Sequence, residues 1–122
     1  MEAIVENEQG GRQSFIEEIM TEVPPVALLE VAKVMGKGAS VYPREPDGTP
    51  NWHKIDCVSN LDHALRHAVK FLVYRNFTPE NRSHRVILEM TEELNHTAAR
   101  SLMALEQWLR NLPNELEYGI RR

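Results

Sequence analysis

The sequence predicts a single all-α domain. Apolar residues recur at helical spacing in several stretches, and no alternating apolar pattern is long enough for a sheet. Prolines and glycines separate those stretches, and no internal repeat is present. The chain has 122 residues, of which 42% are hydrophobic and 26% charged, which is an ordinary globular composition. We expect a bundle of about four helices.

The N-terminal segment differs from the rest in composition. Residues 1–13 are polar and glycine-containing, so we expect a loose arm. Ser14 is a good cap for a short helix through Met20, because Glu17 stands three residues further on as in a capping box. The helical domain is therefore predicted over residues 14–112, with a tail at 113–122.

A second helix is expected to start at Pro25, a favoured first-turn residue, and to stop at Gly36 and Gly38. The stretch from residue 42 to residue 54 follows it and contains several proline and glycine turn formers. Connections of this length in compact domains tend to be functional. We expect a structured loop that contributes to a site.

Two longer helices complete the predicted domain. Asn60 is a good N-cap for a helix running to about Asn76, whose core stripe comprises Leu61, Leu65, Ala68 and Leu72. A final helix, starting at about Pro79 or Arg85, keeps helical apolar spacing to Leu109. It is the longest predicted element.

Charge and cysteine content exclude several classes of protein. The net charge of −4 argues against a broad surface for nucleic acid or anionic membrane. Cys57 is the single cysteine, so neither an intramolecular disulfide nor a thiolate zinc site can form. The sequence has no secretory leader pattern and no run of apolar residues long enough to span a bilayer. We expect a soluble, cytoplasmic protein.

One predicted helix carries charges of both signs at regular spacing. Asp62, Arg66 and Lys70 repeat every four residues and so project from neighbouring faces. A carboxylate can bind a divalent metal, and the two cations can neutralise phosphate oxygens. This combination suits a metal-bound polyphosphate, although an ion pair between Asp62 and Arg66 on a solvated face explains the same residues.

The final helix carries an acidic cluster. Glu89, Glu92, Glu93 and His96 lie within two turns, and three carboxylates with an imidazole can hold one or two divalent ions. The cluster lies opposite the apolar positions, where solvated charge is the usual occupant. Its metal-binding role therefore requires that another helix, from this chain or a second subunit, cover it.

The long loop contains a candidate base-binding group. Trp52 can stack on a purine and Asn51 can read a base edge, with Tyr42 and Lys54 nearby. It is equally consistent that Trp52 only attaches the loop to the core.

These motifs, taken in order, resemble a family of small phage dATP/dGTP diphosphohydrolases, the MazZ type, related to the MazG-like all-α nucleoside triphosphate pyrophosphohydrolases. The matching residues are Pro24, Pro25, Ala27, Leu28, Glu30, Val31, Ala32, Gly38, Ala39, Tyr42, Asn51, Trp52, Asp62, Arg66 and His67. The chain departs from the family pattern at Ser40, Val41 and Glu93.

The resemblance implies a MazG-like helical bundle that is oligomeric, as a homodimer or homotetramer. It implies metal-dependent hydrolysis of a purine (deoxy)nucleoside triphosphate, (d)GTP or dATP, to the monophosphate and pyrophosphate, in remodelling of the nucleotide pool of a phage-infected cell. The cofactor would be Mg²⁺ or Mn²⁺.

The resemblance also assigns roles. The expected catalytic residues are Glu30, Asp62 and Glu93. The expected metal ligands are Asp62, Glu89, Glu92, Glu93 and His96. The expected substrate-binding residues are Tyr42, Asn51, Trp52, Lys54, Arg66, His67 and Lys70. Two alternatives stay open, namely a catalytically silent nucleotide-binding protein and a helical interaction protein.

Overall fold

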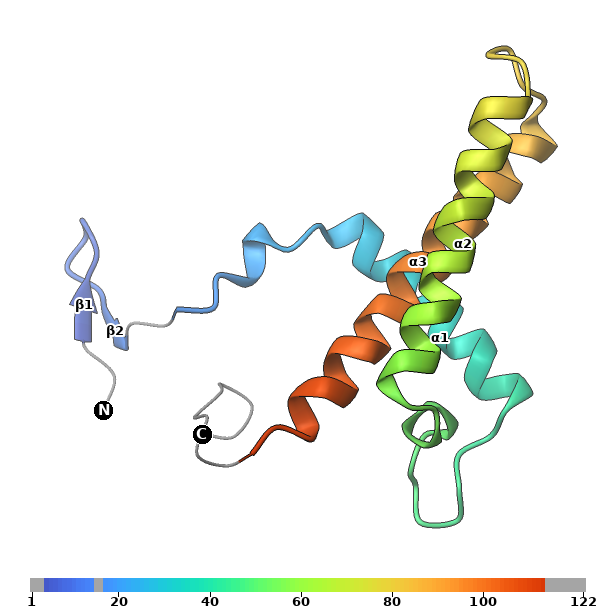
Figure 1. Ribbon diagram of the computed structural model, residues 1–122. Helices are drawn as coiled ribbons and strands as arrows, with labels where there is room; N and C mark the ends of the chain where they lie inside the picture. Colours follow the sequence, from blue (N-terminus) through green and yellow to red (C-terminus); the bar gives the residue numbers. More distant parts are fainter. Residues whose placement is uncertain (1–3, 15–16, 114–122) are drawn as a thin grey trace.

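A computed structural model describes residues 4–14 and 17–113, and its main body consists of three α-helices (Figure 1). The elements in chain order are β1 (Ile4–Glu6), β2 (Arg12–Ser14), the 3-10 turn η1 (Met20–Glu22), α1 (Pro25–Val41), the 3-10 turn η2 (Asn51–Lys54), α2 (Cys57–Phe77) and α3 (His84–Arg110). The all-α prediction is confirmed, with three α-helices among the described residues instead of about four. None of the described helices combines the length and apolar character needed to cross a membrane.

The pair formed by α2 and α3 is the centre of the fold. The two helices lie side by side along much of their length, and α1 crosses them and packs on α3 (Figure 1). The buried side chains are small at this centre: Ala64 on α2, and Ala99 and Ala104 on α3. Small residues let two helix backbones approach closely. Val31 is the buried hydrophobic residue of α1.

The start of α2 differs from the prediction. Asp56, not Asn60, is the N-cap, since its carboxylate accepts a hydrogen bond from the Ser59 backbone N–H at 2.7 Å. Asn60 lies one turn inside the helix and is fully buried. The start of α3 is close to the prediction, with Ser83 accepting a hydrogen bond from the Val86 N–H at 3.3 Å.

The predicted end of α1 is wrong. Neither Gly36 nor Gly38 takes a positive φ, and the helix continues through both to Val41. Glycine within a helix costs only about 1 kcal/mol relative to alanine, so tertiary context can override it. The helix ends just before Pro43, which disfavours helical geometry at the preceding residue.

The predicted helix from Ser14 to Met20 is also wrong over its described residues. Ser14 ends β2, which pairs antiparallel with β1, and Met20 begins the short η1 turn. The side chain of Asn7 closes the hairpin by accepting hydrogen bonds from the Gln9 and Gly11 N–H groups. The predicted loose arm therefore contains a small hairpin, which stands apart from the helices in Figure 1. Residues 114–122 of the predicted tail lie outside the described residues.

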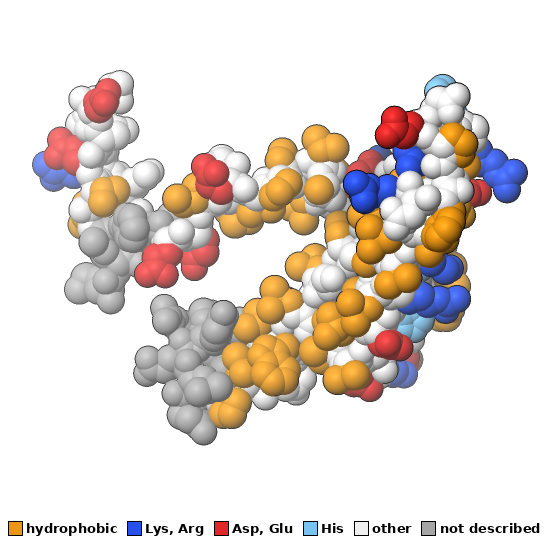
Figure 2. Space-filling model, turned by 45° about the horizontal axis from the view of Figure 1, so that its top comes forward, with side chains coloured by type: hydrophobic (Ala, Val, Ile, Leu, Met, Phe, Trp, Pro, Cys, Tyr) orange, Lys and Arg blue, Asp and Glu red, His pale blue; other side chains and the backbone are white. Residues whose placement is uncertain are grey.

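Much of the predicted core stripe of α2 is uncovered. Leu61, Leu65 and Leu72 are 48%, 58% and 48% exposed, because α1 packs on α3 and leaves that side of α2 open. Several apolar residues of α3 are exposed to a similar degree. Figure 2 shows hydrophobic side chains at the surface over the helices and along the segment that leads into α1. Three helices of one chain do not bury their own apolar faces.

Candidate functional site

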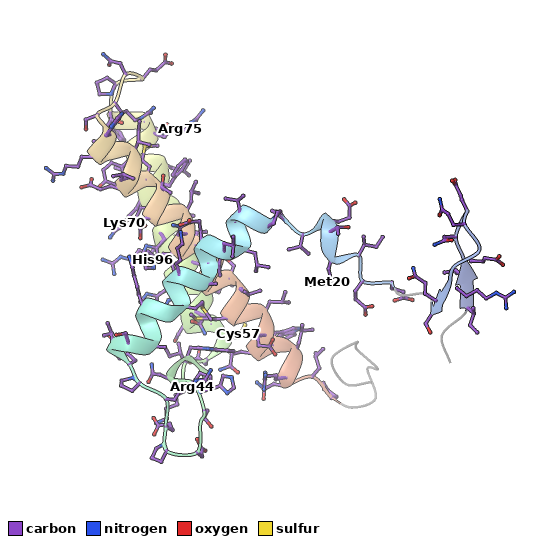
Figure 3. The ribbon with its side chains drawn as sticks, turned by 180° about the vertical axis from the view of Figure 1, so that it is seen from behind. Met20, Arg44, Cys57, Lys70, Arg75 and His96 are labelled. Carbon is purple, nitrogen blue, oxygen red and sulfur yellow. The ribbon has the colours of Figure 1, made fainter. Side chains whose placement is uncertain are left out.

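A pocket of about 400 Å³ lies between α1, the loop that follows it, and α3. Five of the predicted site residues line it: Tyr42, Asn51 and Trp52 from the loop region, and Glu92 and His96 from α3. Figure 3 shows α1 passing over α3 near His96, with Arg44 further down where the loop begins. The structure thus brings together loop-region and α3 groups that are 40 or more residues apart in the chain.

Three cations that the site prediction missed also line the pocket: Lys37, Arg44 and Arg100. Lys37 reaches it because α1 continues past the two glycines. Arg100 follows Glu92 and His96 at the same four-residue spacing along α3. This spacing is the feature of the sequence that could have indicated that Arg100 shares their side of the helix. Arg44 also donates a hydrogen bond to the Gly48 carbonyl at 2.6 Å and so stabilises its own loop.

The η2 turn, which carries Asn51 and Trp52, is attached to α3 by Gln107. The buried amide of Gln107 donates to the carbonyl oxygens of His53 at 2.7 Å and Ile55 at 3.0 Å, with the Trp52 carbonyl at 3.3 Å. An amide nitrogen has two protons, so the two shorter contacts are the stronger ones. Gln107 therefore fixes the position of the η2 turn along the axis of α3.

A second cluster lies behind the pocket, between α2 and α3. His67 Nδ1 and Glu93 Oε2 are 2.7 Å apart, and both side chains are largely buried. The His67 ring stacks on His96, with centroids 4.9 Å apart. Burial and the nearby His67 lower the pKa of His96 below its ordinary value. His96 is therefore neutral at pH 7, and its ring is held between the cluster and the pocket.

Besides His67 and Glu93 of the second cluster, six predicted site residues lie outside the pocket, and four of these lie on α2 or in the loop region. Asp62, Arg66 and Lys70 are exposed on α2, and Lys54 forms an ion pair with Glu45 within the loop. All three α2 residues lie on one helix, as their spacing predicted. The position of that surface relative to the loop depends on how α1 and α3 pack, which spacing alone does not define.

Glu30 and Glu89 also lie outside the pocket, and each has a local partner. Lys33, 2.9 Å from Glu30, is the main cause of the lowered pKa of that carboxyl group. A hydrogen bond from the Tyr74 phenol is the main cause of the lowered pKa of Glu89, and Arg85 is the next. The hydrogen bond between Tyr74 and Glu89 also raises the pKa of the Tyr74 phenol. Both glutamates are therefore ionised but already compensated at neutral pH.

Two side chains in the pocket, the Glu92 carboxylate and the His96 imidazole, are groups that can bind a divalent cation. Glu92 Oε2 lies 3.8 Å from His96 Nε2, on one face of α3. Within the part of the chain that the structure describes, no group of three or more His, Cys, Asp or Glu side chains is gathered to hold a metal ion. Mg²⁺ commonly takes only one or two carboxylates, together with substrate phosphates. Glu92 and His96 fit a cation that is bound together with substrate, not a preformed cage.

The fold and pocket define a helical protein with an aromatic, cation-rich cavity of the size that takes a small polar ligand. A family model described as dATP/dGTP diphosphohydrolase, N-terminal, matches residues 7–114. The chain belongs to this family, as the sequence motifs predicted. No curated protein and no solved structure gave a match.

The attachment of η2 by Gln107 can be tested with Gln107→Leu. This change keeps the approximate volume but leaves buried carbonyl oxygens without a donor, which should lower the free energy of unfolding by about 1–3 kcal/mol. Hydrogen exchange of residues 51–55 should accelerate as well. Gln13→Leu, at an exposed position in β2, is the matched control and should change neither quantity. Unaltered exchange in Gln107→Leu would show that the turn does not depend on this residue.

The lowered pKa of His96 predicts a pH dependence of stability. The unfolded chain protonates His96 near the ordinary pKa of 6.5, whereas the folded chain resists protonation, so the unfolded state binds more protons. The stabilising contribution is complete above pH 6.5 and is lost as the pH falls through the lower folded pKa. Urea unfolding between pH 7.5 and 5 should show a smaller slope in His96→Gln than in wild type. Ala98→Gln, which introduces the same amide at an exposed position of α3 and removes no imidazole, should keep the wild-type slope.

Proposed function

We propose that the protein hydrolyses a purine deoxynucleoside triphosphate, dATP or dGTP, to the monophosphate and pyrophosphate. The family match supports the substrate class. The observation that carries the proposal is one pocket lined by aromatic rings, cations and a carboxylate–imidazole pair. These are the groups that a base, a polyphosphate and an attacking water each require.

The loop side of the pocket suits the base. Trp52 and Tyr42 offer flat apolar surfaces on which a purine can stack, and the Asn51 amide can both donate to and accept from a base edge. Trp52 is half-buried and its turn is held by Gln107, so its ring needs little reordering when a base binds. A rigid aromatic surface reduces the entropy lost on binding.

The α3 side suits the phosphates and the reacting water. In the proposed reaction, water forms a bond to the α-phosphorus, the bond from this phosphorus to the bridging oxygen breaks, and pyrophosphate leaves. Neutral His96 can accept the proton of the water, with Glu92 beside it, and the pocket cations compensate charge on the phosphate oxygens. Glu93 and His67 hold the His96 ring in position from behind.

We further propose Mg²⁺ or Mn²⁺ as cofactor, with Glu92 and His96 as the protein ligands in the pocket. The two roles of His96 are alternatives, because an imidazole nitrogen that binds the cation has no lone pair for a proton. With His96 as a ligand, the Glu92 oxygen that does not bind the cation would accept the proton of the water. The bound cation would neutralise phosphate charge and lower the pKa of a bound water. A role in phage nucleotide-pool remodelling stays a prediction.

Pyrophosphate release from the eight common nucleoside triphosphates, with Mg²⁺, Mn²⁺ or EDTA, tests the reaction. We expect metal-dependent release from dATP or dGTP and not from pyrimidine triphosphates. Glu92→Gln should reduce the rate by about 100-fold or more. Glu106→Gln on the same helix, which disrupts an ion pair with Arg110, should retain the wild-type rate. Nucleotide binding without any pyrophosphate release would favour the silent nucleotide-binding protein instead.

We also propose that the active form is a homodimer. Val58, Leu61, Leu65, Val69 and Leu72 form an exposed apolar stripe on α2 at helical spacing. Burying a leucine side chain contributes about 1.5–3 kcal/mol, and stripes of this kind mark interfaces. A second copy on α2 would also approach Asp62, Arg66 and Lys70. Their predicted roles, and those of Glu30 and Glu89, stay predictions that depend on such a partner.

Sedimentation tests the dimer. Wild type should sediment at twice the 14.1 kDa chain mass, and Leu65→Glu should shift it toward the monomer because a charge in an apolar interface is costly. His63→Glu places the same charge at a polar exposed position of α2 and should leave the dimer intact. A wild-type monomer at working concentrations would contradict the proposal.

A further inference from the structure

Asn60 is a fully buried polar residue, with 0% of its surface exposed, and both ends of its amide are used. Its oxygen accepts a hydrogen bond from Arg100 Nη1 at 3.0 Å, and its nitrogen donates to the Ile55 carbonyl at 3.3 Å. The residue therefore connects α2, the end of the loop and α3. A buried amide with this set of partners is held in one orientation.

Arg100 lies between Asn60 and the pocket, which its side chain helps to line. Within residues 4–14 and 17–113, the Arg100 guanidinium group forms no ion pair with a carboxylate, whereas Lys33, Arg85 and Arg110 each have a glutamate partner. Arg100 is half-buried. Among the described residues, its positive charge thus lies at the pocket without a carboxylate as ion-pair partner.

The positive charge of Arg100 stays available to a ligand because its hydrogen-bond partner on α2, Asn60, is an amide and not a carboxylate. An amide oxygen orients the guanidinium through one hydrogen bond but leaves its charge available to a ligand. A carboxylate at the same place would pair with the charge. Guanidinium groups present several N–H donors in a rigid plane that matches phosphate oxygens.

We propose that Asn60 is a positioning residue that presents Arg100 to the pocket, and that Arg100 binds a phosphate group of the nucleotide. The inference rests on the proposed function and identifies the part of the substrate that this side of the pocket recognises. Asn60 contacts no ligand in this account and acts only through Arg100.

The test measures binding, so that it is independent of turnover. The probes are the α,β-methylene analogues of dATP and dGTP, which resist cleavage between the α and β phosphates, and the corresponding deoxynucleosides, titrated calorimetrically in the presence of Mg²⁺. Arg100→Gln should weaken triphosphate-analogue binding by about 10- to 100-fold, the range of a hydrogen bond to a charged group, and leave deoxynucleoside binding unchanged. Arg85→Gln, the same change at an exposed position of α3, should affect neither probe.

The positioning role of Asn60 is tested by a double-mutant cycle. Asn60→Ser should weaken analogue binding in the wild-type background but have no further effect in Arg100→Gln. A merely structural role predicts the same loss in both backgrounds. If Asn60→Ser does not fold, Asn60→Asp replaces it, because a carboxylate can still orient Arg100 while pairing with its charge. Asn60→Asp should then weaken analogue binding in the wild-type background and have no effect in Arg100→Gln.

The outcomes separate this inference from the proposed function. If wild type binds neither analogue, the proposed function and the inference both fail. If wild type binds an analogue and Arg100→Gln binds it equally well, only the phosphate-binding role of Arg100 is overturned. If the Asn60 effect persists in Arg100→Gln, the positioning role of Asn60 is overturned.

Discussion

The packing of α2 against α3 is the contact on which the rest of the structure depends. Ala64, Ala99 and Ala104 allow the two backbones to approach closely, and this approach lets Asn60 reach Arg100 and His67 reach Glu93. The neighbouring side of α3 then faces α1 and the loop. One helix thus carries both the structural contacts and the pocket groups, because Glu92, His96 and Arg100 recur every four residues along it.

Polar contacts, more than apolar burial, define the pocket. Few hydrophobic side chains of the described residues are buried, whereas the polar residues Gln107 and Asn60 are. Gln107 connects α3 to the η2 turn, and Asn60 connects the end of that turn to α2 and α3. A buried amide is costly unless its hydrogen bonds are made, so these two contacts favour one position of the loop. The apolar stripe of α2 is exposed to solvent in a single chain, which is unfavourable. We propose that a second copy of the chain covers it.

Local signals in the sequence predicted most of the fold. Helical spacing and Pro25 defined where helices form. The glycines of α1 were misread as its end and Asn60 as the N-cap of α2, because tertiary contacts decide between such options. For the candidate site, residue type and spacing singled out Trp52 and His96, which line the pocket. Arg100 and Gln107 were not among the predicted site residues. Gln107 acts through its hydrogen bonds to loop carbonyls and Arg100 through its hydrogen bond to the buried Asn60 amide, and only the packing of distant segments places these partners.

Hydrogen exchange with and without nucleotide tests the central claim that the cavity between α1, the loop and α3 is the nucleotide site. The protein would be compared with and without the α,β-methylene analogues of dATP and dGTP in the presence of Mg²⁺. We predict that protection increases in residues 34–52 and 92–103, which line the pocket. Protection confined to the exposed face of α2 around Asp62, Arg66 and Lys70 would contradict the account and locate the nucleotide on the other side of the helix pair.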